Sequence, residues 1–330
     1  MKFLFTILIL LSAQFSFTQS ISGYKIAKTF HIASAGGWDY ILADQGRLYV
    51  SHGTQVNILN QKTGDSLGYI PNTLGVHGIA IDPDNGKGYT SNGRLNTITE
   101  FNVKTMDTIK QIPVGQNPDA IMYEPYTKKI ITCNGRSSNL SIVDPVKEAE
   151  VATIPLEGKP ETAVSDGMGK LFVNIEDKSK IAVVDLKTNK VIASWSLSPG
   201  EGPTGLAYDV KTKRLFAGCD KQLIVVNAEN GSIAAKVPIG DGCDGVAFDN
   251  SLKLVFASCG AGVLSIIHEL SADNYSLIEN LPTKRSARTI GLDERSHEVF
   301  LPAADMQAPA AQGERPRMVP GTFQILVVSK

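Results

Sequence analysis

The chain has 330 residues, of which 42% are hydrophobic and 20% are charged, and these proportions are typical of an ordinary globular protein. Its 32 basic and 33 acidic residues give a formal net charge of -1, so no overall field favours nucleic acid or an anionic membrane as a partner. No segment reaches the roughly 20 apolar residues that a transmembrane helix needs.

Residues 1–20 are the first element that the sequence predicts. Lys2 precedes an apolar run from Phe3 to Leu11, and small and polar residues follow it. This order is typical of a signal peptide, which we expect to be removed near Thr18. The sequence therefore predicts a secreted or periplasmic protein with no transmembrane span.

A two-residue marker, usually an apolar residue followed by an aromatic one, recurs along the rest of the chain every 40 to 44 residues. Its seven occurrences are Leu48-Tyr49, Gly88-Tyr89, Ile130-Ile131, Leu171-Phe172, Leu215-Phe216, Val255-Phe256 and Val299-Phe300. A second marker, an Asx residue that ends an apolar strand, keeps the same period at Asn60, Asn102, Asp144, Asp185 and Asn227. A period near 40 residues is the length of a propeller blade, so seven markers predict seven blades.

Each repeat contains four short alternating segments, which we call strands A, B, C and D in chain order. In the fifth repeat these are TGLAYDV, KRLFAGC, QLIVVN and SIAAKV. Turn sequences such as Asp84-Asn85-Gly86 join them. We expect each Asx marker to bind backbone amides two residues on and so to begin the C–D turn.

The seventh repeat ends at Lys330 without a strand D, and the segment YKIAKTFHI, residues 24–32, has the pattern of one. We therefore expect the N-terminal strand to complete the last blade. The sequence predicts an all-β protein in which residues 21–330 form a single seven-bladed propeller with four antiparallel strands per blade.

The segments GRLYVSHG, GKGYTSNG, KKIITCNG and GKLFVNI, each followed by an apolar strand that ends in Asx, resemble the YVTN-repeat β-propeller family. The resemblance covers essentially residues 21–330. It implies the fold, an exported location and a binding role, and it implies no particular ligand.

The D–A and B–C connections of a propeller open on one face, where ligand sites usually lie. Counting back 10 to 12 residues from the second residue of each strand-B marker places one side chain per blade at the channel mouth. These side chains are Asp39, His77, Asp119, Glu161, Thr204, Asp244 and Arg288. Crowded carboxylates repel, so a cation, a bound ligand or Arg288 is needed to keep them ionised.

Two interpretations of this ring stay open. The residues are either solvated groups that bind loop amides, or a ligand site built from His77, Asp119 and Glu161. Oxygen ligands suit Ca²⁺ or Mg²⁺, whereas His77 favours a transition metal, so a divalent metal is compatible with the residues but not identified by them.

The B–C loops add a rim with basic members, namely His52, Arg94 and Arg136, of which His52 is interpreted as a turn residue. Blade 7 carries a Pro-rich insertion, residues 302–321, in its B–C connection. A loop of this length is usually functional or disordered, and we interpret it as a partial cover of the mouth that supplies Arg315 and Arg317 for an anion.

Of the four cysteines, three fall at strand ends on the same face. The spacing of the blade 6 hairpin places Cys243 opposite Cys259, and we predict a disulfide between them in an oxidising compartment. A bridge between Cys219 and Cys243 is the second choice, and either one leaves Cys133 unbridged.

The sequence thus predicts an exported, monomeric binding module for a small molecule, a glycan or a protein segment. The alternative is a propeller hydrolase or lyase, similar to a lactonase, that uses a metal or pairs His77 with Glu161. No GxSxG, HExxH, P-loop or GxGxxG motif supports a specific enzyme class.

Overall fold

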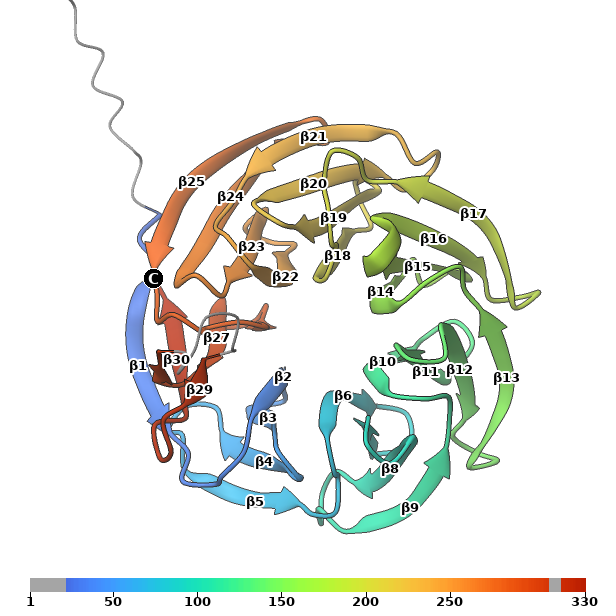
Figure 1. The fold of residues 1–330 in the computed structure, drawn as a ribbon, viewed down its shortest axis with the longest axis vertical. Helices are drawn as coiled ribbons and strands as arrows, with labels where there is room; N and C mark the ends of the chain where they lie inside the picture. The colour runs from blue at the N-terminus through green and yellow to red at the C-terminus, as the bar shows by residue number, and fades with distance from the viewer. Residues whose placement is uncertain (1–21, 309–315) are drawn as a thin grey trace, which may run out of the picture.

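The computed structural model describes residues 22–308 and 316–330, and the predicted signal peptide lies outside them. Seven four-stranded antiparallel sheets stand around a central axis like the blades of a propeller (Figure 1). This arrangement confirms the predicted seven-bladed all-β fold. Within the described residues, no helix is long and apolar enough to cross a membrane.

The first six blades follow the chain, each with strand A innermost. Blade 1 contains β2 (Trp38–Asp44), β3 (Arg47–His52), β4 (Gln55–Asn60) and β5 (Ser66–Ile70). Blade 2 contains β6 (Val76–Asp82), β7 (Lys87–Asn92), β8 (Thr97–Asn102) and β9 (Thr108–Pro113). Blade 3 contains β10 (Pro118–Glu124), β11 (Lys129–Asn134), β12 (Asn139–Asp144) and β13 (Ala149–Pro155).

Blade 4 contains β14 (Pro160–Ser165), β15 (Lys170–Ile175), the short 3₁₀ helix η1 (Glu176–Lys178), β16 (Lys180–Asp185) and β17 (Lys190–Ser196). Blade 5 contains β18 (Leu206–Asp209), β19 (Arg214–Cys219), β20 (Gln222–Asn227) and β21 (Ile233–Pro238). Blade 6 contains β22 (Cys243–Asp249), β23 (Leu254–Cys259), β24 (Val263–Ser271) and β25 (Asn274–Pro282).

Blade 7 joins the two ends of the chain. Its sheet order is β1 (Lys25–His31), β30 (Gln324–Ser329), β27 (Glu298–Ala303) and β26 (Gly291–Asp293). The N-terminal strand β1 pairs antiparallel with β30, for example Phe30 with Ile325, as predicted. The ring is therefore closed by main-chain hydrogen bonds between the two termini.

The hydrophobic core lies between neighbouring blades. The strand-B aromatic residues that mark the repeat are fully buried there, and Tyr49 of blade 1, for example, packs against Phe101 of blade 2. Burying one such side chain stabilises the fold by about 1.5 to 3 kcal/mol. The sequence marker is therefore the contact that holds adjacent blades together.

The predicted Asx turns are present. Oδ1 of Asn60 accepts hydrogen bonds from the backbone amides of Lys62 and Thr63, at 2.9 and 3.1 Å. The same turn recurs at the other four markers, Asn102, Asp144, Asp185 and Asn227.

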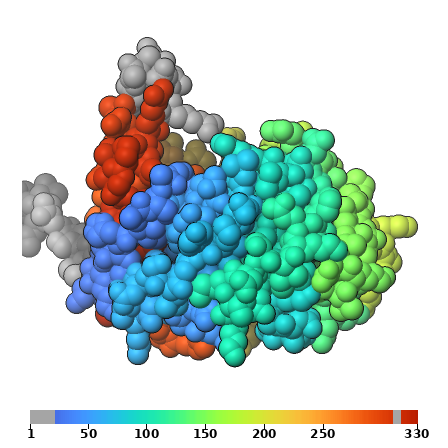
Figure 2. Space-filling model, turned by 90° about the horizontal axis from the view of Figure 1, so that it is seen from below, coloured from blue at the N-terminus to red at the C-terminus, as the bar shows by residue number. Residues whose placement is uncertain are grey.

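The insertion of blade 7 forms a separate small hairpin of β28 (Met306–Gln307) and β29 (Arg317–Met318). Figure 2 shows it, in red, projecting from one face of the disc. An ion pair of 2.7 Å between Lys284 and Asp305, and a hydrogen bond from the Ser286 hydroxyl to the Ala304 carbonyl, hold its base against the D–A connection of blade 7. Its role as a cover of the channel mouth stays a prediction.

Candidate functional site

A recurring backbone irregularity aims one side chain per blade at the channel mouth. The A–B register shifts at the start of strand A in blades 1, 2, 3, 4 and 6. A β-bulge bends its strand and re-aims a side chain. Five of the seven predicted mouth residues lie inside these shifts, namely Asp39, His77, Asp119, Glu161 and Asp244.

Hydrogen bonds between blades fix these backbone positions. The Ser91 hydroxyl of blade 2 donates to the Asp119 carbonyl of blade 3. The Thr289 hydroxyl of blade 7 donates to the Asp39 carbonyl of blade 1 at 2.6 Å, across the point of ring closure. Thr204, the uncharged ring position, donates to the Cys243 carbonyl at 2.8 Å. Hydrogen bonds between neighbouring blades therefore tie the backbone of the mouth together.

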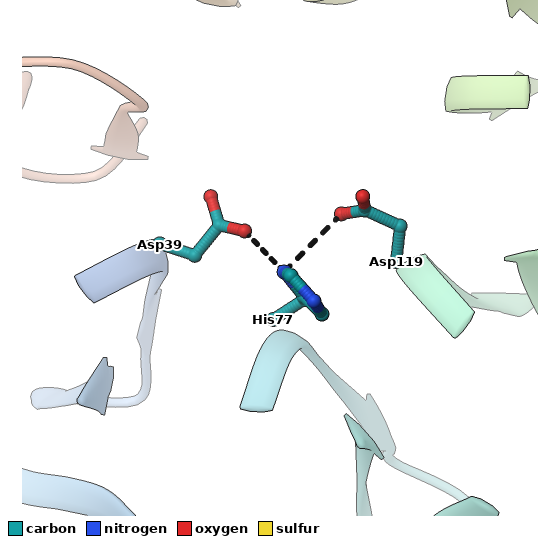
Figure 3. Close-up of side chains that lie close together, drawn as sticks. All are labelled: Asp39, His77 and Asp119. Carbon is teal, nitrogen blue, oxygen red and sulfur yellow. Dashed lines mark hydrogen bonds and ion pairs between the residues drawn. The ribbon is translucent and has the colours of Figure 1, made fainter. Parts of the chain in front are cut away.

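Asp39, His77 and Asp119 converge from three successive blades (Figure 3). Nδ1 of His77 lies 2.6 Å from Oδ2 of Asp39 and 3.7 Å from Oδ1 of Asp119. One ligand atom from each residue lies within 4.8 Å of the other two. Only 9% of Asp119 is exposed, and within the described residues its carboxylate accepts no hydrogen bond. A buried carboxylate without a donor is costly unless a cation or proton satisfies it.

The electrostatics of this cluster follow from burial and crowding. Burial raises the pKa of Asp119 to about 6, and the charge of Asp39 adds to the rise while that of His77 opposes it. Burial lowers the pKa of His77, but the hydrogen bond to Asp39 and the charge of Asp119 outweigh it, so the pKa of His77 lies above its ordinary value. The cluster therefore favours a positive charge at its centre.

The sequence predicts that Glu161 joins His77 and Asp119 in one site, and in the structure Glu161 has an ion pair of its own. Nζ of Lys159 binds the Glu161 carboxylate and lies 2.5 Å from Oε2 of Glu176. Burial and the charge of Asp119 nevertheless hold the pKa of Glu161 above its ordinary value. Lys159 therefore holds Glu161, and Asp39 is the carboxylate in contact with His77, so a His77–Glu161 acid–base pair stays a prediction.

The remaining charged ring positions form a pair of their own. Arg288 of blade 7 binds Asp244 of blade 6 through Nη1. Burial raises the pKa of Asp244, and Arg288 opposes that rise. Arg288 thus neutralises Asp244, while Lys159 pairs with Glu161 and His77 lies between Asp39 and Asp119.

The predicted rim is partly exposed. Arg94, Arg136 and Arg317 lie at the surface, and Arg315 lies outside the described residues. The structure places His52 in the interior instead. Its ring stacks on Phe323 at 4.0 Å, and its two nitrogens contact the Ser34 hydroxyl and the Gly36 carbonyl. Because both nitrogens are satisfied by protein groups, His52 offers nothing to a ligand.

The structure confirms the predicted register of the two blade 6 cysteines, but it contains no disulfide between them. Cys243 lies opposite Cys259 across β22 and β23, and all four cysteines are buried free thiols. Cys243 and Cys259 share a side-chain hydrogen bond, which raises the pKa of Cys243 and lowers that of Cys259. The predicted disulfide is therefore replaced by a thiol–thiol contact in this structure.

Two functional features escaped the sequence analysis. Lys159 is one, and the signal for it is the charged triple of Lys159 before β14, Glu161 in β14 and Glu176 in the B–C connection of the same blade. The other is Tyr40, which follows Asp39 in β2. It packs against the core of blades 3 and 4, and its side chain lies near Thr162 of blade 4. Tyr40 therefore crosses the channel beneath the ring.

Comparisons with known proteins support the fold. No protein-family model matches the chain, and no curated protein matches it in sequence. Among solved structures the chain is similar to the Kuenenia stuttgartiensis hydrazine synthase, with a TM-score of 0.73 and 16% identity over 85% of this chain and 95% of that chain. At this identity the likeness shows the propeller fold alone.

Proposed function

We propose that this propeller is an exported binding protein that holds a divalent transition-metal ion at its channel mouth and uses it to bind a small molecule. The observation that carries the proposal is the convergence of Asp39, His77 and Asp119 around one point, with the Asp119 carboxylate buried and lacking a hydrogen bond within the described residues. Export rests on residues 1–20, and the resemblance to YVTN-repeat propellers supports both the location and the binding role.

The donor set suits such an ion. One borderline imidazole nitrogen and two hard carboxylate oxygens together suit Zn²⁺ or Mn²⁺, whereas Ca²⁺ and Mg²⁺ prefer oxygen alone. Metal–ligand bonds of about 2.0 to 2.2 Å require the proton between His77 and Asp39 to leave and the carboxylates to move by small side-chain rotations. Three protein ligands leave further positions open for a bound molecule.

The charge balance supports a cation as well. Four ring carboxylates and Glu176 face Lys159, Arg288 and His77 as the positive groups of the mouth. Burial raises the pKa values of Asp119 and Glu161, and the charge of a neighbouring carboxylate adds to each rise. A dication at the Asp39–His77–Asp119 cluster offsets the repulsion and favours the ionised carboxylates.

Metal analysis tests the proposal. The protein is stripped with a chelator, titrated with Zn²⁺, Mn²⁺ and Ca²⁺ by calorimetry, and assayed for bound metal after dialysis. We expect one equivalent of Zn²⁺ or Mn²⁺, with affinity reduced at least tenfold in His77→Ala and Asp119→Asn. Asp107→Asn, which changes an exposed carboxylate on a C–D turn of blade 2, is the matched control. Equal binding by all variants, or no stoichiometric binding, overturns the proposal.

A hydrolase or lyase is the second candidate, and one observation favours it. The contact with Asp39 engages Nδ1 of His77 and leaves Nε2, beside Gly93, for acid–base work. A Cβ at Gly93 would lie 2.6 Å from Nε2, so glycine leaves room there. A binding protein loses affinity gradually in His77 and Asp119 variants, whereas an enzyme loses turnover by orders of magnitude while it stays folded.

A further inference from the structure

A small apolar chamber lies directly beneath the metal-binding side of the ring. Its volume is about 190 Å³. Four of its lining residues, Tyr40, Gly78, Ala120 and Thr162, each follow a ring residue in the chain. The rest of the lining is almost entirely aliphatic, with Ile41, Leu42, Ile79, Ile121, Met122, Ile131, Cys133 and Ala163. The candidate ligands Asp39, His77 and Asp119 thus stand one residue above an apolar space.

The residue after each ring position is small on most blades, which lets neighbouring A strands approach each other closely. Gly78 approaches blade 3 so closely that a Cβ there would lie 2.8 Å from Ile121. Tyr40 is the exception, and it crosses to Thr162 and forms one wall of the chamber. A large side chain on one blade and small ones on its neighbours leave a defined space instead of a filled channel.

The apolar lining continues toward the opposite face. A second cavity of about 360 Å³ shares Leu42, Ile79, Ile121 and Met122 with the chamber. It adds Ala80, Ile81, Pro83 and Tyr123 toward the far end of the same strands, together with one carboxylate residue, Asp44. Apolar surface therefore extends through blades 1 to 3 below the polar mouth, so a chain longer than the chamber has apolar surface to follow.

Size and polarity decide what the chamber accepts. A closed apolar cavity of about 150 Å³ in another protein stays dry and binds benzene, so a space of this size suits a group of a few carbons. Water finds few partners there, because the polar side chains of the lining are only Tyr40, Thr162 and Cys133. The chamber favours a small alkyl or aryl group over a polar one.

We propose that this chamber binds the apolar group of the small molecule whose oxygen-donor head is held by the metal at the mouth. The ligand class is therefore a small amphiphile, with a metal-coordinating head and an alkyl or aryl tail of a few carbons. This inference rests on the proposed function, since the metal fixes the head directly above the chamber.

The test uses straight-chain hydroxamic acids. Their hydroxamate group chelates divalent transition metals and stays the same through the series, while only the length of the alkyl chain changes. Calorimetry with the Mn²⁺- or Zn²⁺-loaded mature protein measures the affinity of acetohydroxamic acid and of its homologues up to octanohydroxamic acid. Each buried methylene contributes about fourfold in affinity, so we expect a rise of this slope over the first few carbons and a weaker dependence beyond. A flat series in the wild-type protein overturns the inference.

A variant that fills the chamber provides a second test of the inference. Ala163→Leu places three more carbons in the chamber, and it should abolish the chain-length dependence. Ala149→Leu, on the exposed face of β13, should keep it. An equally steep series in Ala163→Leu overturns the inference, and the wild-type series decides the matter if that variant does not fold.

The experiments distinguish failure of the proposed metal site from failure of the proposed chamber. Metal binding without chain-length dependence contradicts the chamber and leaves the metal site supported. If no metal binds, the proposed function fails, and the chamber is then measured in the metal-free protein with benzene followed by NMR. Benzene-induced shifts confined to residues that line the chamber support an apolar site there, and their absence at millimolar benzene overturns it.

Discussion

Nδ1 of His77 lies 2.6 Å from Oδ2 of Asp39, and this contact joins strand A of blade 2 to strand A of blade 1 at the channel mouth. It gives the imidazole a fixed orientation and couples its charge to the stability of the ring. Its effect can be measured without knowing the ligand.

Asp39→Asn should lower the pKa of His77, because it removes the carboxylate that stabilises the imidazolium. The folded-state pKa of His77 lies above its unfolded value, so its stabilisation is fully present below about pH 6.5 and is lost as pH rises through the folded value. We expect a loss of about 1.5 to 3 kcal/mol at pH 5.5 and a smaller loss at pH 9. NMR titration of the imidazole and urea unfolding at both pH values measure this, and a loss independent of pH contradicts it.

Asp119→Asn should stabilise the metal-free protein at neutral pH. The pKa of Asp119 is raised from its ordinary 3.8 to about 6, so its neutral form is favoured by folding and stability is lost as pH rises through 6. The asparagine avoids this cost, and we expect a gain of up to about 3 kcal/mol at pH 7.5 that vanishes near pH 3.

Saturating metal should make the wild type more stable than Asp119→Asn, because a ligand that binds only the folded state stabilises that state. The wild type should then melt above Asp119→Asn at pH 7.5. Thermal unfolding with chelator and with Mn²⁺ makes the comparison, and Asp107→Asn should match the wild type in both. A variant that is less stable than the wild type in chelator refutes the pKa argument.

Removal of residues 20–33 should destabilise every blade together. The segment supplies β1 and buries Phe30, and its start reaches blade 6, where Ser22 binds Glu279 and Tyr24 packs on Phe256 at 5.2 Å. Phe30→Ala alone should cost about 3 to 5 kcal/mol. Calorimetry should show one transition at a lower temperature, whereas removal of residues 1–19 should leave it unchanged. Separate transitions for blade 7 and the rest contradict a closed cooperative ring.

Controlled oxidation should join Cys243 to Cys259 before the other cysteines react, because only these two share a side-chain contact. The reduced protein should yield four thiols after denaturation, and the oxidised protein should yield two. Mass mapping identifies the pair, and Cys133→Ser should not prevent its formation. A bridge that contains Cys219 would instead support the second choice made from the sequence.

The sequence predicted the elements that depend on local pattern. The strand-B aromatic residues and the Asx turns repeat at a fixed spacing, and the same repeat shows that blade 7 lacks a strand D. The structure confirms the buried aromatic residues, the turns and the N-terminal strand that completes blade 7. The same spacing placed Asp39 and His77 at the mouth. It did not indicate which ring side chains touch, since that depends on the bulges and on neighbouring loops.

Three residues show why the repeat spacing does not reveal the contacts of the mouth. Lys159 captures Glu161 from the same blade, and no periodicity marks a loop lysine as its partner. Tyr40 contacts a blade more than 120 residues away in sequence, at Thr162. His52 lies under Phe323, which a long insertion separates from its own strand B, so its burial follows from tertiary packing alone.

The bulge at the start of strand A is present on five blades, and it affects how the mouth can change in evolution. The bulged residue makes none of the regular ladder pairs, so its side chain can be exchanged with little effect on the strands below it. The channel mouth is thus a set of interchangeable positions on a constant frame, and one substitution at a bulged position, such as Asp244→His beside Arg288, would alter ligand preference without redesign of the fold.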